Sequence, residues 1–270
     1  MIRPKGLIMA AACLLAFAGQ EAMAAKCGNN AGGFANWLNQ FKKEAVAAGI
    51  SQKVVASALN GVTYDARVIR LDRGQKSFNY SFEKFYSIRA RGIEGLARSR
   101  LQSNAALLAK IESRYGVPAE VIVSIWGLET GFGADSGNMS SLRSLATLAY
   151  DCRRSAFFTN ELMAALSIVQ RGDMTPSQMV GAWAGELGQT QFLASSYVKF
   201  AVDFDGNGRR DLIRSKADAL ASTANYLKAY GWKKGQPYQP GTANYAVIGK
   251  WNKARVYQQT IAVLAGKIGG

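Results

Sequence analysis

The chain has 270 residues, with 33 lysines and arginines against 18 aspartates and glutamates, which gives a formal net charge of +15 at pH 7. It contains no histidine, which excludes Ser-His-Asp hydrolysis, Cys-His proteolysis and histidine-ligated zinc. Carboxylates must therefore carry any acid–base chemistry, and the strong positive charge is typical of proteins with a polyanionic partner.

Residues 1–24 have the pattern of a secretory signal peptide. Arg3 and Lys5 precede an apolar run over 7–18, and the small-residue site Ala-Met-Ala follows at 22–24. The run is too short to span a bilayer, so we expect residues 25–270 to be a soluble periplasmic protein with no stable membrane anchor. Export argues against a nucleic acid partner and favours the cell wall or anionic lipid head groups.

Three cysteines are present, and cleavage after Ala24 would remove Cys13 and leave Cys27 and Cys152 in an oxidising compartment. We predict that Cys27 and Cys152 form a disulfide bond. In the chain-entropy model such a bond contributes roughly 3 to 5 kcal/mol of stability because it closes a long loop. The alternative is a pair of unpaired buried thiols.

Apolar residues recur at three- and four-residue spacing along almost the whole chain, which predicts a mainly α fold. No internal repeat or low-complexity linker interrupts the pattern, and the chain is large enough for one compact core. We expect helices at 34–48, 51–59, 81–99, 103–115, 118–128, 142–150, 155–170, 175–184, 195–203, 216–230 and 253–267.

Glu129 lies at the end of the most apolar of these helices. Ile122, Ile125 and Trp126 stand seven, four and three positions before it and share its helix face. A carboxylate on an apolar face loses hydration, so its pKa rises and it can remain protonated near neutrality as a general acid. The alternative is a structural glutamate that turns to solvent or pairs with a buried arginine such as Arg143.

Three segments resemble the lytic murein transglycosylase B family in residues, order and spacing: 129–133 (ETGFG), 145–150 (LATLAY) and 184–192 (AGELGQTQF). The resemblance continues through 195–197, 201–206, 224–226 and 231–232. It implies a lysozyme-like catalytic lobe with additional helices around a glycan-binding cleft. The mature chain would then be one domain, 25–270, with a helical N-terminal part at about 25–117 and a catalytic core at about 118–270.

The resemblance also implies a reaction for Glu129. In that family the matching glutamate protonates the glycosidic oxygen between N-acetylmuramic acid and N-acetylglucosamine in peptidoglycan glycan strands. It then acts as a base on the muramic acid 6-hydroxyl, whose attack on the anomeric carbon gives a 1,6-anhydro product. One carboxylate suffices and catalysis needs no cofactor, unlike the two-carboxylate arrangement of most glycosidases.

Glycan contacts are implied at Gln191 and Tyr226, although Tyr226 also suits a core aromatic residue. Trp251 and Asn252 resemble a further family pair, but their short spacing from Trp232 leaves them outside the predicted site. The sequence departs from the family at two other positions: Ala182 stands where serine is common, and Gln189 where tyrosine is common.

An acidic loop after residue 202 has the alternation of a calcium site. Its oxygen ligands at loop positions 1, 3, 5, 7 and 9 are Asp203, Asp205, Asn207, Arg209 through its backbone carbonyl, and Asp211. The family closes a longer loop with a later aspartate, which Asp218 matches. We expect a structural calcium ion here, and the alternative is an ordinary turn between helices.

Two other functions remain open at this point. A hydrolytic muramidase would use Glu129 together with a water activated by another carboxylate, such as Glu186 or Asp135. A non-catalytic peptidoglycan-binding protein would keep the cleft and the basic surface but would not depend on Glu129. The intact Glu129 motif argues against the non-catalytic binding protein.

Overall fold

The computed structural model of the protein describes residues 26–74 and 80–270, and the predicted signal peptide at 1–24 lies outside them. The fold is mainly α, as predicted, and one two-stranded antiparallel sheet is present in the described ranges. Before the sheet come α1 (Phe34–Ala47), α2 (Gln52–Leu59), α3 (Ala66–Arg73), α4 (Phe82–Arg89), α5 (Glu94–Ser103), α6 (Ala105–Tyr115) and α7 (Ala119–Thr130). From the sheet onwards come β1 (Met139–Ser140), α8 (Ser141–Tyr150), α9 (Ser155–Gln170), β2 (Val180–Gly181), α10 (Ala194–Phe200), α11 (Lys216–Ala229), α12 (Ala243–Trp251) and α13 (Arg255–Gly269).

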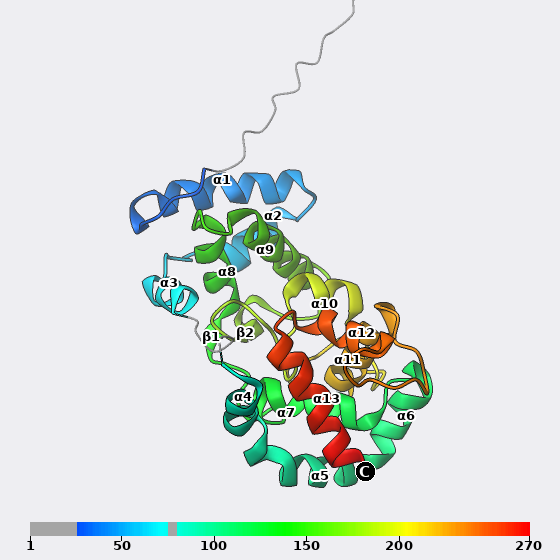
Figure 1. Ribbon diagram of the computed structural model, residues 1–270. Helices are drawn as coiled ribbons and strands as arrows, with labels where there is room; N and C mark the ends of the chain where they lie inside the picture. Colours follow the sequence, from blue (N-terminus) through cyan, green and yellow to red (C-terminus); the bar gives the residue numbers. More distant parts are fainter. Residues whose placement is uncertain (1–25, 75–79) are drawn as a thin grey trace, which may run out of the picture.

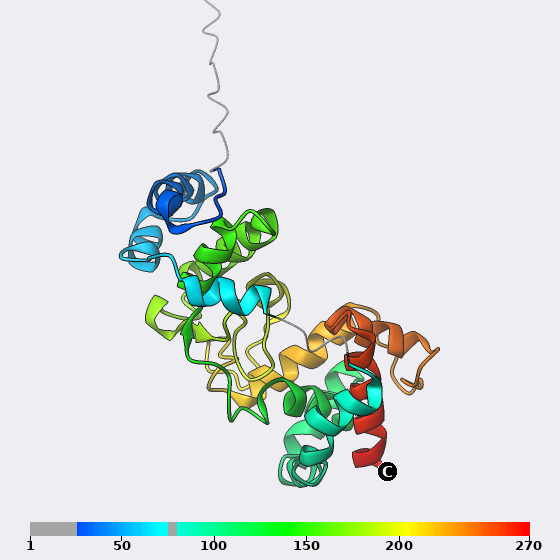
Figure 2. The ribbon, with the colours of Figure 1, turned by 60° about the vertical axis from the view of Figure 1, so that its left-hand side comes forward.

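The helices form two groups (Figures 1 and 2). In one, α1 and α2 pack on α8 and α9. In the other, α7 packs against α13, α5 and α11, with α4 alongside α13. Helix α10 contacts both α9 and α11 and so joins the two groups. None of the described helices is long and apolar enough to cross a membrane.

Two helix predictions were wrong. The helix expected at 81–99 is interrupted at Ala90, where φ of −121° leaves the helical range and a 3₁₀ turn containing Gly92 separates α4 from α5. The helix expected at 175–184 is a short 3₁₀ turn followed by β2. At Gly181 the chain approaches the carbonyl of Glu186 so closely that a Cβ would lie 1.9 Å from the oxygen, a backbone contact that apolar spacing does not reveal.

Two helices were not predicted. Helix α3 begins at Asp65, whose side chain accepts a hydrogen bond from the Arg67 amide. Helix α12 begins at Thr242, which accepts from the Tyr245 amide. Both helices have only two or three turns, so their apolar spacing is too short to predict a helix. The capping residues are the stronger sequence evidence for them.

Helix α7 is the centre of its group. Every residue from Val121 to Leu128 is buried, so this helix is enclosed on all sides and has no solvent-facing stripe. Gly127 is required by packing, because a Cβ there would lie 2.7 Å from the Phe132 ring and 3.0 Å from Ile93. Glu129 lies in the same helix, two residues after Gly127, so its backbone is held rigidly by the surrounding core.

The Cys27–Cys152 disulfide is confirmed, with a Cα–Cα distance of 5.0 Å. The Gly28 amide donates to the Tyr150 carbonyl at 2.9 Å beside it. The bond joins the segment before α1 to the α8–α9 turn, at a sequence separation of 125 residues. It therefore closes a long loop in the unfolded chain.

Replacing both cysteines with serine is expected to lower the free energy of unfolding by about 3 to 5 kcal/mol, because the unfolded chain regains the entropy of this loop. Urea unfolding of the double variant and of the oxidised protein measures the difference. Adding a reductant should lower the stability of the unmodified protein but leave the variant unchanged. Equal stability of both proteins under oxidising conditions would contradict the prediction.

Candidate active site

The Glu129 site is built by a reversal of the chain at the end of α7. Gly131, Phe132 and Gly133 all have positive φ, at 59°, 65° and 83°. Such values suit glycine but are strained for phenylalanine. The turn returns the Phe132 ring onto Trp126 in an edge-to-face contact at 5.4 Å. This explains why two glycines flank Phe132 in the motif.

Thr130 fixes the same turn from within. Its hydroxyl donates to the Gln189 carbonyl at 2.5 Å and accepts from the Gly133 amide at 2.8 Å. The Gln189 side chain adds two further links, because its Oε1 accepts from the Trp126 indole and its Nε2 donates to the Ile213 carbonyl. The Gln189 side chain therefore connects α7 to the loop before α11 through hydrogen bonds.

Glu129 lines a pocket of about 350 Å³. Its other lining residues come from the end of α4 and from α7 and the turn that follows: Ile88, Arg89, Gly127, Leu128, Thr130, Gly131, Ala134 and Asp135. Glu129 as a whole residue is half-buried. Its Oε1 accepts a hydrogen bond of 2.9 Å from the Trp251 indole nitrogen.

The surroundings raise the pKa of Glu129 to about 7. Loss of hydration is the largest cause, and the negative charge of Glu186 acts in the same direction. The Trp251 hydrogen bond, the nearby Tyr257 hydroxyl and the Arg89 guanidinium oppose the rise in pKa. The carboxyl group can therefore give up and recover a proton near neutral pH, as a general acid and base must.

The predicted alternative partner of Glu129, Arg143, lies elsewhere. Its guanidinium donates to the carbonyls of Thr63 and Tyr64 and faces Asp65 at 3.6 Å. No ion pair neutralises Glu129 among the described residues. The structural interpretation of Glu129 as half of a buried ion pair is thus wrong.

The two rival carboxylates differ in their surroundings. Asp135 is exposed at the pocket, and its Oδ1 accepts from the Gly137 amide at 3.1 Å. Glu186 has one carboxylate oxygen fully enclosed without a hydrogen-bond partner, and burial raises the pKa of this group. Glu186 does not line the Glu129 pocket, whereas Asp135 does.

Tyr226 lies beside the site rather than in the pocket. Its hydroxyl donates to the Lys250 carbonyl at 2.6 Å, and its ring meets the Trp251 ring edge to face at 5.0 Å. Phe192 contacts both rings, at 6.1 Å from Tyr226 and 5.3 Å from Trp251. Tyr226 and Phe192 therefore pack around the Trp251 indole that donates to Glu129, which is the core role considered for Tyr226.

Gln191 has a strained backbone, with φ of 53°. Its Nε2 donates to the carbonyls of Gly188 and Ser136, at 2.9 and 3.3 Å. No hydrogen bond to its Oε1 is formed within the described residues. Strained residues of this kind cluster at functional sites, and an acceptor oxygen remains for a ligand.

The acidic loop brings three of its predicted ligands together. Carboxylate oxygens of Asp203, Asp205 and Asp218 lie within 4.8 Å of one another. Asp211 instead pairs with Arg214 at 2.7 Å, and Asn207 accepts from the Arg209 amide. Three oxygen donors at this spacing fit a hard divalent cation such as calcium, which would offset their mutual repulsion. The Arg209 carbonyl and the other two side chains lie on the same loop.

The sequence interpretation missed three residues at Glu129. Trp251 belongs to the pair that resembles the family but whose short spacing from Trp232 excludes it from the predicted site. Its resemblance to the family pair is therefore a sequence feature that could have identified it. Arg89, whose guanidinium donates to the Leu128 carbonyl at 2.9 Å, and Tyr257 come from helices remote in sequence. No local pattern places either of them beside a carboxylate.

Glu129 lies near the end of a buried helix in a mainly α fold and has a raised pKa, which is the setting of a general acid in a lysozyme-like fold. Residues 33–241 match the transglycosylase SLT domain family. The chain belongs to this family.

Relatives with solved structures share the fold over most of the chain. The structure of SltB3 from Pseudomonas aeruginosa in complex with NAG-NAM-pentapeptide is 33% identical, with a TM-score of 0.82, and the match covers 88% of this chain and 80% of that one. A structure of the Escherichia coli lytic transglycosylase Slt35 in complex with calcium is 24% identical, with a TM-score of 0.77. The match covers 91% of this chain and 96% of that one. At this identity the similarity to Slt35 shows a shared fold alone.

Membrane-bound lytic murein transglycosylase B from Escherichia coli K12 is 43% identical over 122 residues. The match covers 45% of this chain and 34% of that protein. The matched segment therefore spans about a third of the curated relative.

Proposed function

We propose that the protein is a peptidoglycan lytic transglycosylase that cleaves the β-1,4 bond between N-acetylmuramic acid and N-acetylglucosamine and leaves 1,6-anhydromuramic acid ends. The observation that carries this proposal is Glu129, a carboxyl group with a pKa of about 7 on the wall of an open pocket. Membership of the transglycosylase SLT domain family supports it. So do two relatives, the lytic murein transglycosylase B of Escherichia coli and the SltB3 of Pseudomonas aeruginosa, which binds NAG-NAM-pentapeptide.

Glu129 would act twice in one turnover. In its protonated form it donates a proton to the glycosidic oxygen as the bond to the muramic acid anomeric carbon breaks. The resulting carboxylate then removes the proton of the 6-hydroxyl of the same sugar, and that oxygen bonds to the anomeric carbon. The second step returns Glu129 to its protonated form, so no water is consumed and no cofactor is needed.

The neighbours of Glu129 suit both steps. The Trp251 indole stabilises the carboxylate form through its hydrogen bond, and the Arg89 guanidinium favours the same form. Burial favours the protonated form. We propose that the free Oε1 of Gln191 accepts a hydrogen bond from the glycan. Tyr226 would contribute to glycan binding at the edge of its ring, in addition to holding Trp251.

Product analysis tests the proposal. Purified cell-wall sacculi are incubated with residues 25–270 of the protein. The masses of the soluble products are then measured by mass spectrometry before and after borohydride reduction. Anhydro products, which borohydride leaves unchanged, are expected. Products heavier by one water that gain two hydrogens on reduction would identify a hydrolytic muramidase, and no release of products would identify a binding protein.

We further propose a structural calcium ion held by Asp203, Asp205 and Asp218, with Asn207, Asp211 and the Arg209 carbonyl as further ligands. The loop precedes α11, whose residue Tyr226 packs on Trp251. The calcium complex of Escherichia coli Slt35 supports this assignment. The ion would stabilise the fold and take no part in bond cleavage.

Calcium at about a hundred times its dissociation constant is expected to stabilise the protein by about 2.7 kcal/mol, since it binds the folded form. Thermal unfolding with calcium and with a chelator measures this effect without reference to activity. Asp218→Asn should remove most of the calcium-dependent shift, whereas Asp135→Asn, which lies outside the loop, should retain it. A shift equal in both variants would rule out this loop as the site.

We also propose that the protein works in the periplasm as one unit, 25–270, made of the helical N-terminal part and the catalytic core. The disulfide bond supports an oxidising compartment. The packing of α1 and α2 on α8 and α9 supports a single unit.

A further inference from the structure

Helix α3 presents a stripe of arginines that the proposed reaction does not use. Arg67, Arg70 and Arg73 follow one another at three-residue spacing, and all three are exposed. The opposite side of the helix is buried, at Val68 and Asp72. Helix α3 therefore packs on the protein through one side and carries three cations on the other.

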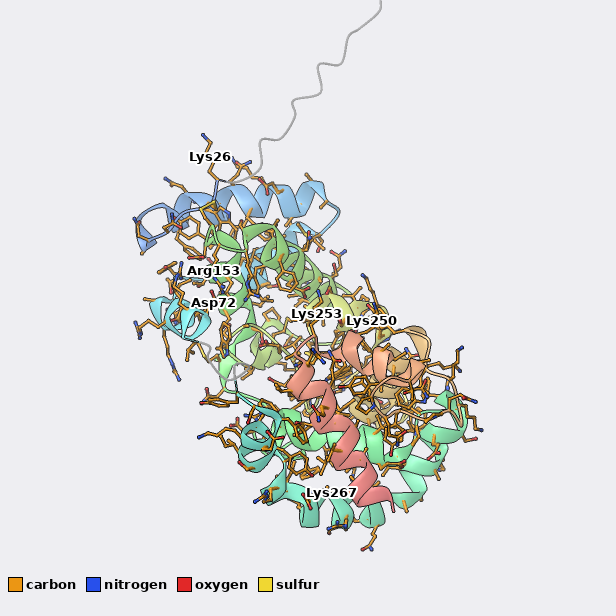
Figure 3. All side chains as sticks on the ribbon, in the orientation of Figure 1. Lys26, Asp72, Arg153, Lys250, Lys253 and Lys267 are labelled. Carbon is orange, nitrogen blue, oxygen red and sulfur yellow. A yellow bond between two sulfur atoms is a disulfide. The ribbon has the colours of Figure 1, made fainter. Side chains whose placement is uncertain are left out.

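The turn between α8 and α9 extends this stripe with Arg153 and Arg154, which are exposed. Both guanidinium groups pair with Asp72 of α3, and Arg73 pairs with Asp151 of the turn at 2.8 Å. Figure 3 shows Asp72 and Arg153 next to each other beside α3. We call five side chains the arginine face: Arg67, Arg70, Arg73, Arg153 and Arg154.

The two aspartates fix three of these arginines in place. Asp72 and Asp151 are buried, and a buried carboxylate requires a cationic partner. The Arg154 guanidinium also lies 4.7 Å from the centre of the Phe158 ring. Because one guanidinium has five N–H donors, each paired arginine keeps donors for a second acceptor. The arginines are thus held at the surface by buried partners and can still bind an anion.

The arginine face carries more positive charge than its aspartates neutralise. Five arginines adjoin two aspartates, which leaves a formal surplus of three positive charges. Arg67 and Arg70 form no ion pair among residues 26–74 and 80–270. No exposed carboxylate occurs in α3 or at 150–158. Since the guanidinium fork matches the oxygens of a phosphate group, a phosphate-bearing polyanion is the partner that fits this face.

Two exposed apolar side chains within the face indicate the kind of polyanion. Leu71, which precedes Asp72 on α3, is 37% exposed. Phe157 is 42% exposed, and its ring centre lies 5.8 Å from the Arg154 guanidinium. Apolar side chains among cations enter the boundary between the head groups and the acyl chains of a bilayer. A soluble polyanion would offer them no apolar contact, so the combination favours a lipid surface.

We propose that the arginine face docks reversibly on bilayers that contain anionic phospholipid. The guanidinium groups bind lipid phosphates, and Leu71 and Phe157 lie at the head-group boundary. None of these residues lines the Glu129 pocket, so the inference is independent of the reaction proposed for Glu129. Docking would hold the protein at a membrane surface without a segment that spans the bilayer.

The test measures the sedimentation of residues 25–270 with vesicles, so that the predicted signal peptide cannot contribute. One set of vesicles contains equal parts of phosphatidylglycerol and phosphatidylcholine, and the other contains phosphatidylcholine alone. The arginine variant is Arg67→Gln with Arg70→Gln, which leaves the buried aspartates paired. The matched control is Lys110→Gln with Lys234→Gln, two exposed lysines outside the face that lack ion pairs in the described part of the chain.

The unmodified protein should bind the phosphatidylglycerol vesicles and not the neutral ones, and 0.5 M salt should release it. The arginine variant should bind about tenfold more weakly or worse, because each cation close to an anionic lipid surface adds severalfold to the affinity. The control should stay within about twofold of the unmodified protein, since screening weakens the attraction of cations that lie farther than a Debye length from the surface.

A second variant separates a lipid surface from a soluble polyanion. Leu71→Ser with Phe157→Ser should weaken vesicle binding about fivefold, because apolar area no longer enters the bilayer. Its retention on phosphocellulose, which offers phosphates without an apolar phase, should equal that of the unmodified protein. Unchanged vesicle binding by this variant would overturn the assignment to lipid.

Equal binding of the unmodified protein to both kinds of vesicle, or to neither, would overturn the inference. So would equal losses in the arginine variant and the lysine control. Circular dichroism shows whether each variant folds. If the arginine variant does not, the salt series on the unmodified protein decides, because binding that persists in 0.5 M salt excludes docking through exposed cations.

Discussion

Glu129→Gln is expected to lower the rate of glycan cleavage by about a thousandfold or more. Proton transfer by a positioned side chain contributes roughly 10²- to 10⁴-fold, and here one group serves both steps. Glutamine keeps the size and the Trp251 contact but cannot give up or take a proton. Release of anhydro ends from sacculi, measured over hours, should fall to the background of an incubation without enzyme.

Two control variants separate one-carboxylate from two-carboxylate chemistry. Asp135→Asn and Glu186→Gln remove the carboxylates that a muramidase would use to activate water. We expect each to lower the rate less than tenfold, since neither group takes part in the proposed steps. A loss at either position as large as that of Glu129→Gln would favour hydrolysis.

Glu129→Gln is also expected to stabilise the protein at alkaline pH. The pKa of Glu129 rises from 4.5 in the unfolded chain to about 7 in the folded protein. Between these values the folded form retains a proton that the unfolded form has lost, so the free energy of unfolding falls as the pH rises. Above pH 7 the loss is complete and amounts to at most about 3 kcal/mol.

Glutamine does not titrate and avoids this loss. Glu129→Gln should therefore exceed the unmodified protein in stability at pH 8 by up to about 3 kcal/mol, and the difference should nearly vanish at pH 4.5. Urea unfolding at the two pH values measures it. Glu83→Gln, in the exposed first turn of α4, is the control and should show the same small difference at both. A difference for Glu129→Gln that does not depend on pH would contradict the raised pKa.

The inactive variant would thus be the more stable one above neutrality. Burial of Glu129 raises its pKa to the range in which a general acid works, and the same burial destabilises the ionised protein. Active sites commonly show this opposition between stability and activity.

The sequence predicted those parts of the fold that depend on local pattern. Apolar spacing located α1, α7 and α9 to within about two residues, and the Ser51 cap marked the start of α2. It failed at 175–184, where the requirement that Gly181 lie against the Glu186 backbone replaces a helix with a strand. That contact depends on residues brought together by folding.

The candidate site shows the same division. The position of Glu129 on an apolar face predicted its raised pKa without knowledge of the fold. The partners that adjust this pKa could not be predicted, because Arg89 is 40 residues before Glu129 and Tyr257 is 128 residues after it in the sequence. Tyr226 was predicted from its motif to contact glycan, and its bond to the Lys250 carbonyl shows a packing role as well.

The central claim is that cleavage proceeds without water as a reactant. Its most direct test is to digest peptidoglycan in water enriched in oxygen-18 and to measure the mass of the newly formed muramic acid ends by mass spectrometry. Because the 6-hydroxyl of the sugar takes the place of water, we predict anhydro ends without the label. Muramic acid ends that carry one oxygen-18 atom at the anomeric carbon would contradict this account and identify the enzyme as a hydrolase.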